Sequence, residues 1–401
     1  SNGDAYVWNF SFEQQIKIAQ GMVKNYTDER ERWLAQGKPE DIDAFINVNE
    51  QVLKWIRYTK RSLGRNKEVT YDESKLRTGL YRPFCKNAYY FERIFNEDIY
   101  QFPRIFPMPS TEQENRVICV SGIGSSKDFH CVMSDKIVCL DALEKTQCFP
   151  LYTYDTETGE RRENITDWGL DEVRSRYGAA GAGITKADIF HYIYALLHAP
   201  SYRTKYAANL RRDLPRVPFA GDFGDFQTFV GVGQRLADLH VNYEAVPEWD
   251  GLEWSGAEDF LSKKRTLQER QAFFALGYEK MKLRGVKAQG AKVKDGEELP
   301  ATLTLEYNGN LTISGIPREV LAYKLGTRSA LEWVVERYCI TTDAVKEQAD
   351  GTRRGSGIVN DPNRSEAMLR EPEYVARLVG RVVRVSMETQ ALVRLLPQKN
   401  E

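Results

Sequence analysis

The chain has 401 residues, a formal net charge of −1 and 42% hydrophobic residues, and it is rich in tyrosine and phenylalanine. A chain of this length and composition can bury a large core, which excludes an intrinsically disordered protein. The near-zero net charge excludes a uniformly basic nucleic-acid-binding protein, so such binding would need a local excess of lysine and arginine.

The six cysteines form no CxxC pair, and four of them lie in apolar runs typical of strands. This pattern predicts buried free thiols in a reducing compartment and argues against zinc ligands. The sequence has no long apolar run and no signal peptide, so we expect a cytoplasmic protein without a membrane partner. Because it begins SNGDAYVWNF, without a methionine, we expect a piece of a longer polypeptide.

The first 66 residues are predicted to be mostly helical. Apolar residues recur with helical spacing in SFEQQIKIAQGMVKNYTDERERWLAQ (11–36) and in DIDAFINVNEQVLKWIRYTKRSLG (41–64). The second of these helices ends in KWIRYTKRSLGRNK (54–67), which has six basic residues and no acidic one. From 54 to 93 there are eleven Lys and Arg residues against four acidic ones, a net charge of +7.

Residues 80–156 are predicted to form a β-rich lobe, in which residues 115–155 form an antiparallel meander. The segment NRVICVSGIGSSKDFHCVMSDKIVCLDALEKTQCFPLYTYD (115–155) alternates short β-branched and aromatic runs with turn residues. We interpret GIGSS in this segment as a turn, because it lacks the GxGxxG spacing of a dinucleotide-binding loop.

Helices are predicted again after residue 180. Thr185 and Asp188 have the spacing of a capping box, and Pro200 suits the start of a second helix. We expect Pro215 to end that second helix, and a third helix to follow in DFQTFVGVGQRLADLHVNYE (225–244).

The second of these helices, over 201–214, carries several cations. Helical geometry places Tyr202 and Leu214 on one face and spreads the cations around the remaining surface. We therefore expect a helix that supports the fold, with at most Lys205 or Arg212 near a phosphate.

The C-terminal part is predicted to contain a hairpin, two helices and a long loop. ATLTLEYNGNLTISGIP (301–317) has Asn-Gly at its turn, and Ser329 with Glu332 forms a capping box before ALEWVVERY. TTDAVKEQADGTRRGSGIVNDPNRS (341–365) is polar and predicts a long loop. A last helix is expected over 372–396, with a stripe of cations at Arg377, Arg381 and Arg384.

No catalytic motif is recognised in the sequence. The four histidines form no HExxH or HxH arrangement, and GxSxG, the phosphate-binding loop and the Asn/Asp-Pro-Pro-Tyr motif of adenine methyltransferases are missing. We therefore expect no catalytic residue, no metal site and no cofactor in this chain. One alternative remains open, an enzyme whose site is built from scattered histidines and aspartates.

A series of motifs in the same order resembles the C-terminal specificity domain of type ISP single-chain restriction-modification enzymes. The resemblance extends from about Asp4 to Pro397. Its motifs are YVWNF, KWIRYTKRSL, LYRPFCKNAYYFE, YQFPRIFP, QCFPLYTYD, NITDWGL, ITKADIFHYIYALLHAPSYRTKYAANLRRDLPRVPF, LADLHVNYE, ALEWVVERY and SGIVNDPN.

The resemblance implies that this chain is a target recognition domain for duplex DNA and has no catalytic function alone. In that family a nuclease, an ATP-driven translocase and an adenine methyltransferase precede the recognition domain on one polypeptide. The implied partners are double-stranded DNA and the methyltransferase and helicase domains. S-adenosylmethionine, ATP and Mg would serve the other domains of a parent enzyme that methylates adenine and cleaves unmodified DNA.

Phosphate contacts require cations, and arginine can also bind guanine edges in the major groove. The residues expected to contact DNA are Lys60, Arg61, Arg65, Lys67, Arg77, Arg82, Lys86, Arg353, Arg354 and Arg381. A second alternative remains open, a scaffold that packs against its sister domains and does not touch DNA.

The expected fold class is α+β. We predict a helical connector to an upstream methyltransferase over 1–70 and a β-rich recognition lobe over 71–180. We also predict a helical lobe over 181–290 and a region with a β-hairpin and helices over 291–401.

Overall fold

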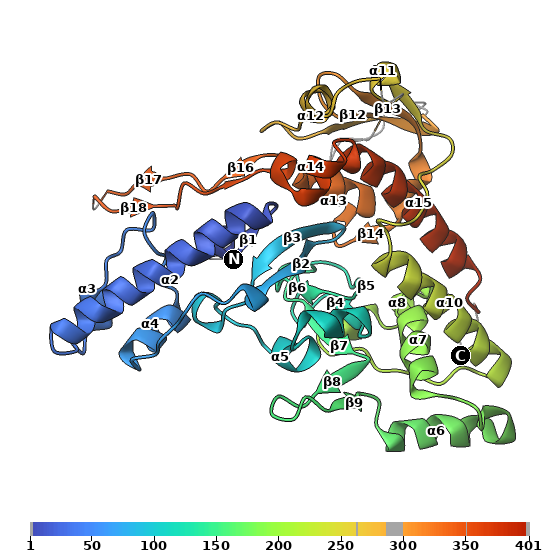
Figure 1. Ribbon diagram of the computed structural model, residues 1–401. Helices are drawn as coiled ribbons and strands as arrows, with labels where there is room; N and C mark the ends of the chain where they lie inside the picture. Colours follow the sequence, from blue (N-terminus) through green and yellow to red (C-terminus); the bar gives the residue numbers. More distant parts are fainter. Residues whose placement is uncertain (1–2, 262–263, 286–299, 350, 398–401) are drawn as a thin grey trace.

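The protein is described here by a computed structural model that covers residues 3–261, 264–285, 300–349 and 351–397. Several small, mainly antiparallel sheets alternate with groups of helices, which confirms the predicted α+β class. Figure 1 shows the long N-terminal helix on one side of the molecule and the C-terminal helix on the other, with β2 and β3 between them.

The N-terminal part is built on one long helix. Ser11 caps this helix, because its side chain accepts the backbone N–H of Gln14. The second predicted helix, over 41–64, is wrong as a continuous element: the side chains of Asn47 and Asn49 bond to nearby backbone N–H groups, and these turns interrupt the helix. The elements are α1 (Asp4–Val7), β1 (Trp8–Asn9), α2 (Phe12–Ala35), α3 (Ile42–Phe45) and α4 (Arg57–Gly64).

Two separate sheets replace the single predicted meander. One has the strand order β1-β3-β2-β6, in which β6 is parallel to β2, and the other has the order β5-β4-β7. Gly79 is required in β2, since a Cβ atom there would lie 2.5 Å from the ring of Trp8. The strands are β2 (Leu76–Arg82), β3 (Cys85–Tyr90), β4 (Val117–Val120), β5 (Cys131–Ser134), β6 (Ile137–Val138) and β7 (Gln147–Pro150).

The predicted meander over 115–155 is interrupted because β6 joins the sheet of β2 and β3. Residues 91–116, which connect β3 to β4, form no strand. Pro103, Pro107 and Pro109 have no backbone N–H to donate to a ladder, and short helical turns form instead. These turns are η2 (Arg93–Phe95), α5 (Phe102–Ile105) and η3 (Pro109–Gln113). A separate two-stranded ribbon, β8 (Tyr152–Tyr154) and β9 (Arg161–Glu163), follows the second sheet.

The helical part confirms the capping box of Thr185 and Asp188 and the position of Pro200 in the first turn of a helix. The helix predicted to end at Leu214 stops at Leu210. The chain then turns back, and the hydroxyl of Tyr202 donates to the backbone oxygen of Arg216. The helices are α6 (Asp167–Tyr177), η4 (Gly178–Gly181), α7 (Lys186–Leu196), α8 (Pro200–Lys205), α9 (Ala207–Leu210) and α10 (Phe223–Val241), and α10 confirms the third predicted helix.

The C-terminal part begins with a four-stranded antiparallel sheet of order β10-β13-β12-β11. Its central hairpin confirms the turn predicted at Asn308, whose side chain accepts the backbone N–H of Asn310 and Leu311. The elements are β10 (Glu253–Ser255), α11 (Glu258–Leu261), α12 (Leu267–Phe274), β11 (Lys282–Arg284), β12 (Thr302–Glu306) and β13 (Thr312–Pro317).

The remaining elements lead to the C-terminal helix and confirm the capping box of Ser329 and Glu332. They are η5 (Arg318–Ala322), β14 (Lys324–Leu325), β15 (Arg328–Ser329), α13 (Ala330–Arg337), η6 (Pro362–Arg364), α14 (Glu366–Arg370) and α15 (Tyr374–Arg394).

The long loop predicted over 341–365 forms a two-stranded arm instead. Its ladders pair β16 (Thr341–Thr342) with β19 (Val359–Asn360) and β17 (Lys346–Glu347) with β18 (Arg353–Arg354). Figure 1 shows the arm extending beside α2. The backbone N–H of Gly355 donates to the carboxylate of Glu50 at 2.8 Å, and this bond holds the arm against the N-terminal part.

The core joins the helical and C-terminal parts through His240 on α10. Its Nδ1 lies 2.5 Å from the hydroxyl of Tyr194 on α7, and its Nε2 lies 2.8 Å from the hydroxyl of Thr389 on α15. Burial lowers the pKa of His240 to about 3, so the imidazole is neutral near neutral pH.

The cysteines are free, and all but the half-buried Cys148 are buried, which confirms the predicted free thiols. Of the helices in the described ranges, none has the length and apolar character needed to cross a membrane.

Candidate nucleic-acid interface

Three exposed cations of the predicted set lie at the C-terminal end of α4. This helix buries Thr59, Ser62 and Leu63 against the core, so Arg61 on its opposite face is exposed. Arg65 ends the helix, since its backbone N–H donates to the carbonyl of Arg61, and the chain continues through Lys67; both side chains are exposed. We call Arg61, Arg65 and Lys67 the α4 basic surface. Cations at a helix C-terminus are favoured by the helix dipole, so a stabilising role accounts for part of this pattern.

An aromatic ring and an arginine extend this surface. The guanidinium of Arg93 lies 3.6 Å from the ring centroid of Tyr58, and the guanidinium of Arg61 lies 5.4 Å from the same ring. A hydrogen bond from Arg93 holds the pKa of Tyr58 below its ordinary value. Tyr58 therefore joins α4 to the η2 turn by cation–π contacts.

Lys60 is less available than its neighbours on α4. Its ammonium group forms an ion pair with Asp43 on α3, and its side chain is half-buried. Because the carboxylate of Asp43 is exposed, this ion pair is screened by water and weak.

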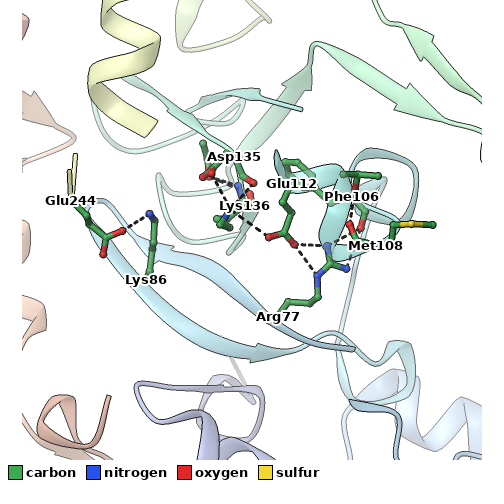
Figure 2. Close-up of polar contacts among 10 residues, drawn as sticks. Arg77, Lys86, Phe106, Met108, Glu112, Asp135, Lys136 and Glu244 are labelled. Carbon is green, nitrogen blue, oxygen red and sulfur yellow. Dashed lines mark hydrogen bonds and ion pairs between the residues drawn. The ribbon is translucent and has the colours of Figure 1, made fainter. Parts of the chain in front are cut away.

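Arg77 points into the protein (Figure 2). Its Nε donates to Glu112 at 2.8 Å, its terminal nitrogens donate to the backbone oxygen of Phe106 at 3.3 Å, and both Arg77 and Glu112 are buried. Burial raises the pKa of Glu112, although Arg77 and Lys136 act in the opposite direction. The position of Arg77 therefore favours a structural role over direct DNA contact.

Arg82 is also buried. Its guanidinium lies 4.0 Å from the ring centroid of Tyr81, donates to the backbone oxygen of Tyr81 at 2.6 Å and lies 3.9 Å from a carboxylate oxygen of Asp4. These contacts fix the end of the β2–β3 hairpin against the N-terminal segment.

Lys86 on β3 points toward the helical part (Figure 2). Its Nζ donates to Glu244 at 2.6 Å and lies 4.7 Å from the ring centroid of Tyr243. Burial acts to raise the pKa of Glu244, but Lys86, Tyr374 and Arg381 outweigh it and keep this pKa below its ordinary value. Lys86 therefore connects β3 to the segment after α10.

The predicted cations near the C-terminus lie on two different elements. Arg353 and Arg354 are exposed on β18, in the two-stranded arm. Arg381 is half-buried on α15 and acts electrostatically on Glu244. The expected stripe of cations on α15 is largely neutralised, since Arg377 pairs with Glu248 at 2.6 Å and Arg384 pairs with Asp250 at 2.8 Å.

Lys205 and Arg212, the cations of the 201–216 segment expected near a phosphate, are exposed, as are Arg211 and Arg216. Lys205 lies 5.7 Å from the ring centroid of Tyr206. Leu214, which was expected on the buried face, is 42% exposed because the helix has already ended.

An open groove lies next to the α4 basic surface. Its volume is about 1000 Å³, and its walls come from the start of β2, the segment 103–111 and the turn of the β8–β9 ribbon. Arg93 lines this groove and contacts Tyr58, whose ring also lies near Arg61, so Arg93 and Tyr58 link the groove to the α4 basic surface.

Sequence reasoning did not single out Arg93 or the β8–β9 ribbon. In the sequence, Arg93 is marked only by its place in the basic stretch before Phe95. The fold is needed to show that its guanidinium lies over the ring of Tyr58. The ribbon was hidden in the expected meander, although its turn contains Asp155 and Gly159, two typical turn residues.

The described ranges contain no group of three or more His, Cys, Asp or Glu side chains arranged to hold a metal ion. The α4 basic surface presents exposed guanidinium and ammonium groups near the ring of Tyr58, which suits binding of a polyanion.

Comparison with known proteins gives a consistent result. A family model described as the Type ISP C-terminal specificity domain matches residues 1–378. No curated protein sequence matches the chain.

Three solved structures are similar over nearly the whole chain. A nuclease-deletion mutant of the Type ISP restriction-modification enzyme LlaGI, in complex with a DNA substrate mimic, has 28% identity and a TM-score of 0.76 over 98% of this chain and 32% of its own. The DrdV–DNA complex, solved by cryoEM, has 30% identity and a TM-score of 0.74 over 100% of this chain and 35% of its own. The ATP-dependent Type ISP restriction-modification enzyme LlaBIII bound to DNA has 25% identity and a TM-score of 0.76 over 99% of this chain and 22% of its own. The chain thus corresponds to 22–35% of the length of these proteins.

Proposed function

Because this chain belongs to the Type ISP C-terminal specificity domain family, we propose that it recognises a short sequence in duplex DNA as the target recognition domain of a longer restriction-modification enzyme. The observation that carries this proposal is its similarity, over at least 98% of its length, to three proteins whose structures contain DNA or a DNA mimic.

The proposal assigns phosphate contacts to exposed cations. The strongest candidates are the α4 basic surface, with Arg61, Arg65 and Lys67, and the arm residues Arg353 and Arg354. Exposed cations displace condensed counterions from DNA when they bind phosphates, which makes such binding salt-dependent.

The other predicted cations take secondary or supporting roles in this proposal. Lys60 and Arg381 are half-buried beside carboxylates, so they would reach phosphate only by exchanging partners. Arg77, Arg82 and Lys86 hold β2 and β3 in place from inside the protein.

The parent enzyme would methylate adenine and cleave unmodified DNA through domains outside this chain. The duplex would lie between this domain and the methyltransferase, which would receive the flipped target adenine. S-adenosylmethionine, ATP and Mg would bind the other domains. The division into a connector (1–70), a recognition lobe (71–180), a helical lobe (181–290) and a C-terminal region (291–401) remains part of this proposal.

One observation favours a second function, packing against sister domains. Trp168 at the start of α6 is 73% exposed, and no residue of α6 is fully buried. Tryptophan is enriched at protein–protein interfaces, so this exposed ring supports contact of α6 with another domain. The two functions are compatible, since one domain can bind DNA on one side and a sister domain on another.

The proposal is tested by measuring the affinity of the chain for a labelled duplex across a salt series. The wild-type affinity should fall as salt rises, and the double variant Arg61→Glu/Arg65→Glu should bind more weakly with a shallower salt dependence. Lys282→Glu is the matched control, an exposed cation on β11, whose sheet lies away from α4 in Figure 1. Binding that is insensitive both to salt and to the double variant would contradict the proposal.

A further inference from the structure

The β8–β9 ribbon is firmly held at its base and exposed at its tip. The amide of Asn115 donates to the backbone oxygen of Tyr152 at 2.9 Å and accepts the backbone N–H of Tyr152 at 3.0 Å. The hydroxyl of Tyr154 donates to Glu114 at 2.8 Å. Beyond these contacts, every residue from 156 to 164 is exposed, and Figure 1 shows the ribbon projecting at the edge of the molecule near α5.

The turn at the tip is ordered by its own hydrogen bonds. A carboxylate oxygen of Asp155 accepts the backbone N–H groups of Glu157 at 3.0 Å and Thr158 at 2.9 Å. Gly159 closes the turn at a φ of 73°, a left-handed conformation that favours glycine. The side chains at the tip are therefore presented by a defined backbone.

The charges on the ribbon do not suit phosphate binding. Residues 152–163 carry four acidic side chains and two arginines, a net charge of −2. Arg162 pairs with Glu160 at 2.9 Å, and Arg161 pairs with Glu114 at 2.7 Å. Each arginine of the ribbon thus has a carboxylate of this chain as its partner, although these exposed ion pairs are weak.

The tip does suit the edges of bases. Hydroxyl groups donate to and accept from several base edges, and a carboxylate accepts from the amino group of cytosine. Thr156 and Glu157 are exposed side chains of this kind at the tip, whereas the exposed Thr158 accepts the backbone N–H of Glu160 and Glu160 pairs with Arg162. A two-stranded ribbon is also narrow enough to enter the DNA major groove, which is about 12 Å wide.

The ribbon lies on the same side as the α4 basic surface. Its turn and Arg93 both line the open groove, and Arg93 contacts Tyr58 on α4. Figure 1 places α4, α5 and the ribbon along one edge of the molecule. A duplex held by phosphate contacts to α4 would therefore pass close to the ribbon.

We infer that the β8–β9 ribbon enters the major groove and reads base edges with Thr156 and Glu157, while the α4 basic surface binds phosphates. This inference rests on the proposed function, and it divides binding into a part that depends on sequence and a part that does not.

The test is selection of preferred duplexes from a randomised pool. It uses the wild-type chain, Thr156→Ala/Glu157→Ala, and the matched control Glu279→Ala/Thr302→Ala, whose exposed residues lie next to β11 and on β12. The ribbon variant should lose roughly tenfold or more in its preference for the wild-type sequence over random duplex. Its affinity for random duplex should change less than twofold, and thermal unfolding should show that it remains folded.

The outcomes distinguish failure of this inference from failure of the proposed function. A ribbon variant that selects the wild-type sequence with undiminished preference would overturn the inference and indicate that the ribbon faces a protein domain. A wild-type chain that binds duplex without any preference would overturn it as well. A wild-type chain that binds no duplex would instead contradict the proposed function on which the inference rests.

Discussion

The Nε atom of Arg77 lies 2.8 Å from a carboxylate oxygen of Glu112, and both side chains are buried beneath the groove. This pair joins β2 to the η3 turn, and Lys136 lies 3.5 Å from the other oxygen of the same carboxylate. The segment that forms one wall of the groove is therefore held in place by an internal ion pair.

Breaking this pair should destabilise the protein strongly. Glu112→Ala would leave the buried guanidinium of Arg77 without its carboxylate, and we expect a loss of about 3–5 kcal/mol in the free energy of unfolding, measured with urea. The matched control is Asp43→Ala, which removes the exposed partner of Lys60 and should cost less than about 1 kcal/mol. Equal effects of the two substitutions would show that the Arg77 pair is not structural.

Replacing both members of the pair distinguishes the stability contributed by filling this buried space from the stability contributed by the ion pair. Arg77→Met/Glu112→Leu removes both charges and fills similar space, so we expect it to be clearly more stable than Glu112→Ala alone. Urea unfolding measures the difference, and a double variant less stable than the single one would show that the ion pair contributes more than apolar packing can replace.

His240 should make the stability depend on pH. Its pKa falls from 6.5 to about 3 on burial, so the unfolded chain binds a proton between these values while the folded chain does not. Stability should therefore fall as the pH decreases from about 6.5 toward 3, and at pH 5 this residue should account for a loss of about 2 kcal/mol relative to pH 7.

His240→Gln tests this assignment. The variant should be less stable at pH 7, because the hydrogen bonds to Tyr194 and Thr389 change, but it should lose less stability between pH 7 and pH 5. Denaturant curves at the two pH values measure this difference. Wild-type and variant stabilities that decline in parallel would exclude His240 as the source.

The two-stranded arm should contribute to DNA affinity through its arginines. Arg353→Glu/Arg354→Glu should weaken duplex binding at low salt and make its salt dependence shallower, by roughly one unit of slope for each phosphate that the arm no longer neutralises. Glu347→Lys is the control on the facing strand, and it should not weaken binding. Titration of a labelled duplex provides the measurement, and unchanged binding by the double variant would remove the arm from the interface.

Local patterns in the sequence predicted much of the fold. The capping boxes at Thr185 and Ser329 and the Asn308 turn depend on neighbouring residues, and the structure confirms each of them. The parallel pairing of Gly79 and Leu80 in β2 with β6 joins residues more than fifty positions apart, and no local pattern predicts it.

The surroundings of the cations are likewise not predicted by local sequence patterns. The sequence places Lys86 in a basic stretch, but its partner Glu244 follows 158 residues later and converges with it only through the packing of α10. Arg61 and Arg65 are exposed, but the buried residues of α4 include the polar Thr59 and Ser62, so apolar spacing does not mark the buried face of this helix. The exposure of these cations and the pairing of Lys86 with a distant carboxylate therefore both require the fold.

The central claim, that the α4 basic surface binds DNA phosphates, is tested most directly by lysine acetylation footprinting with mass spectrometry. This measurement needs no substitution, since exposed Lys67 lies in the surface and exposed Lys282 lies on β11 as an internal reference. If the claim is correct, duplex DNA will slow acetylation of Lys67 and leave Lys282 unchanged, and protection will disappear at high salt. Bound DNA that protects Lys282 and leaves Lys67 fully reactive would contradict it.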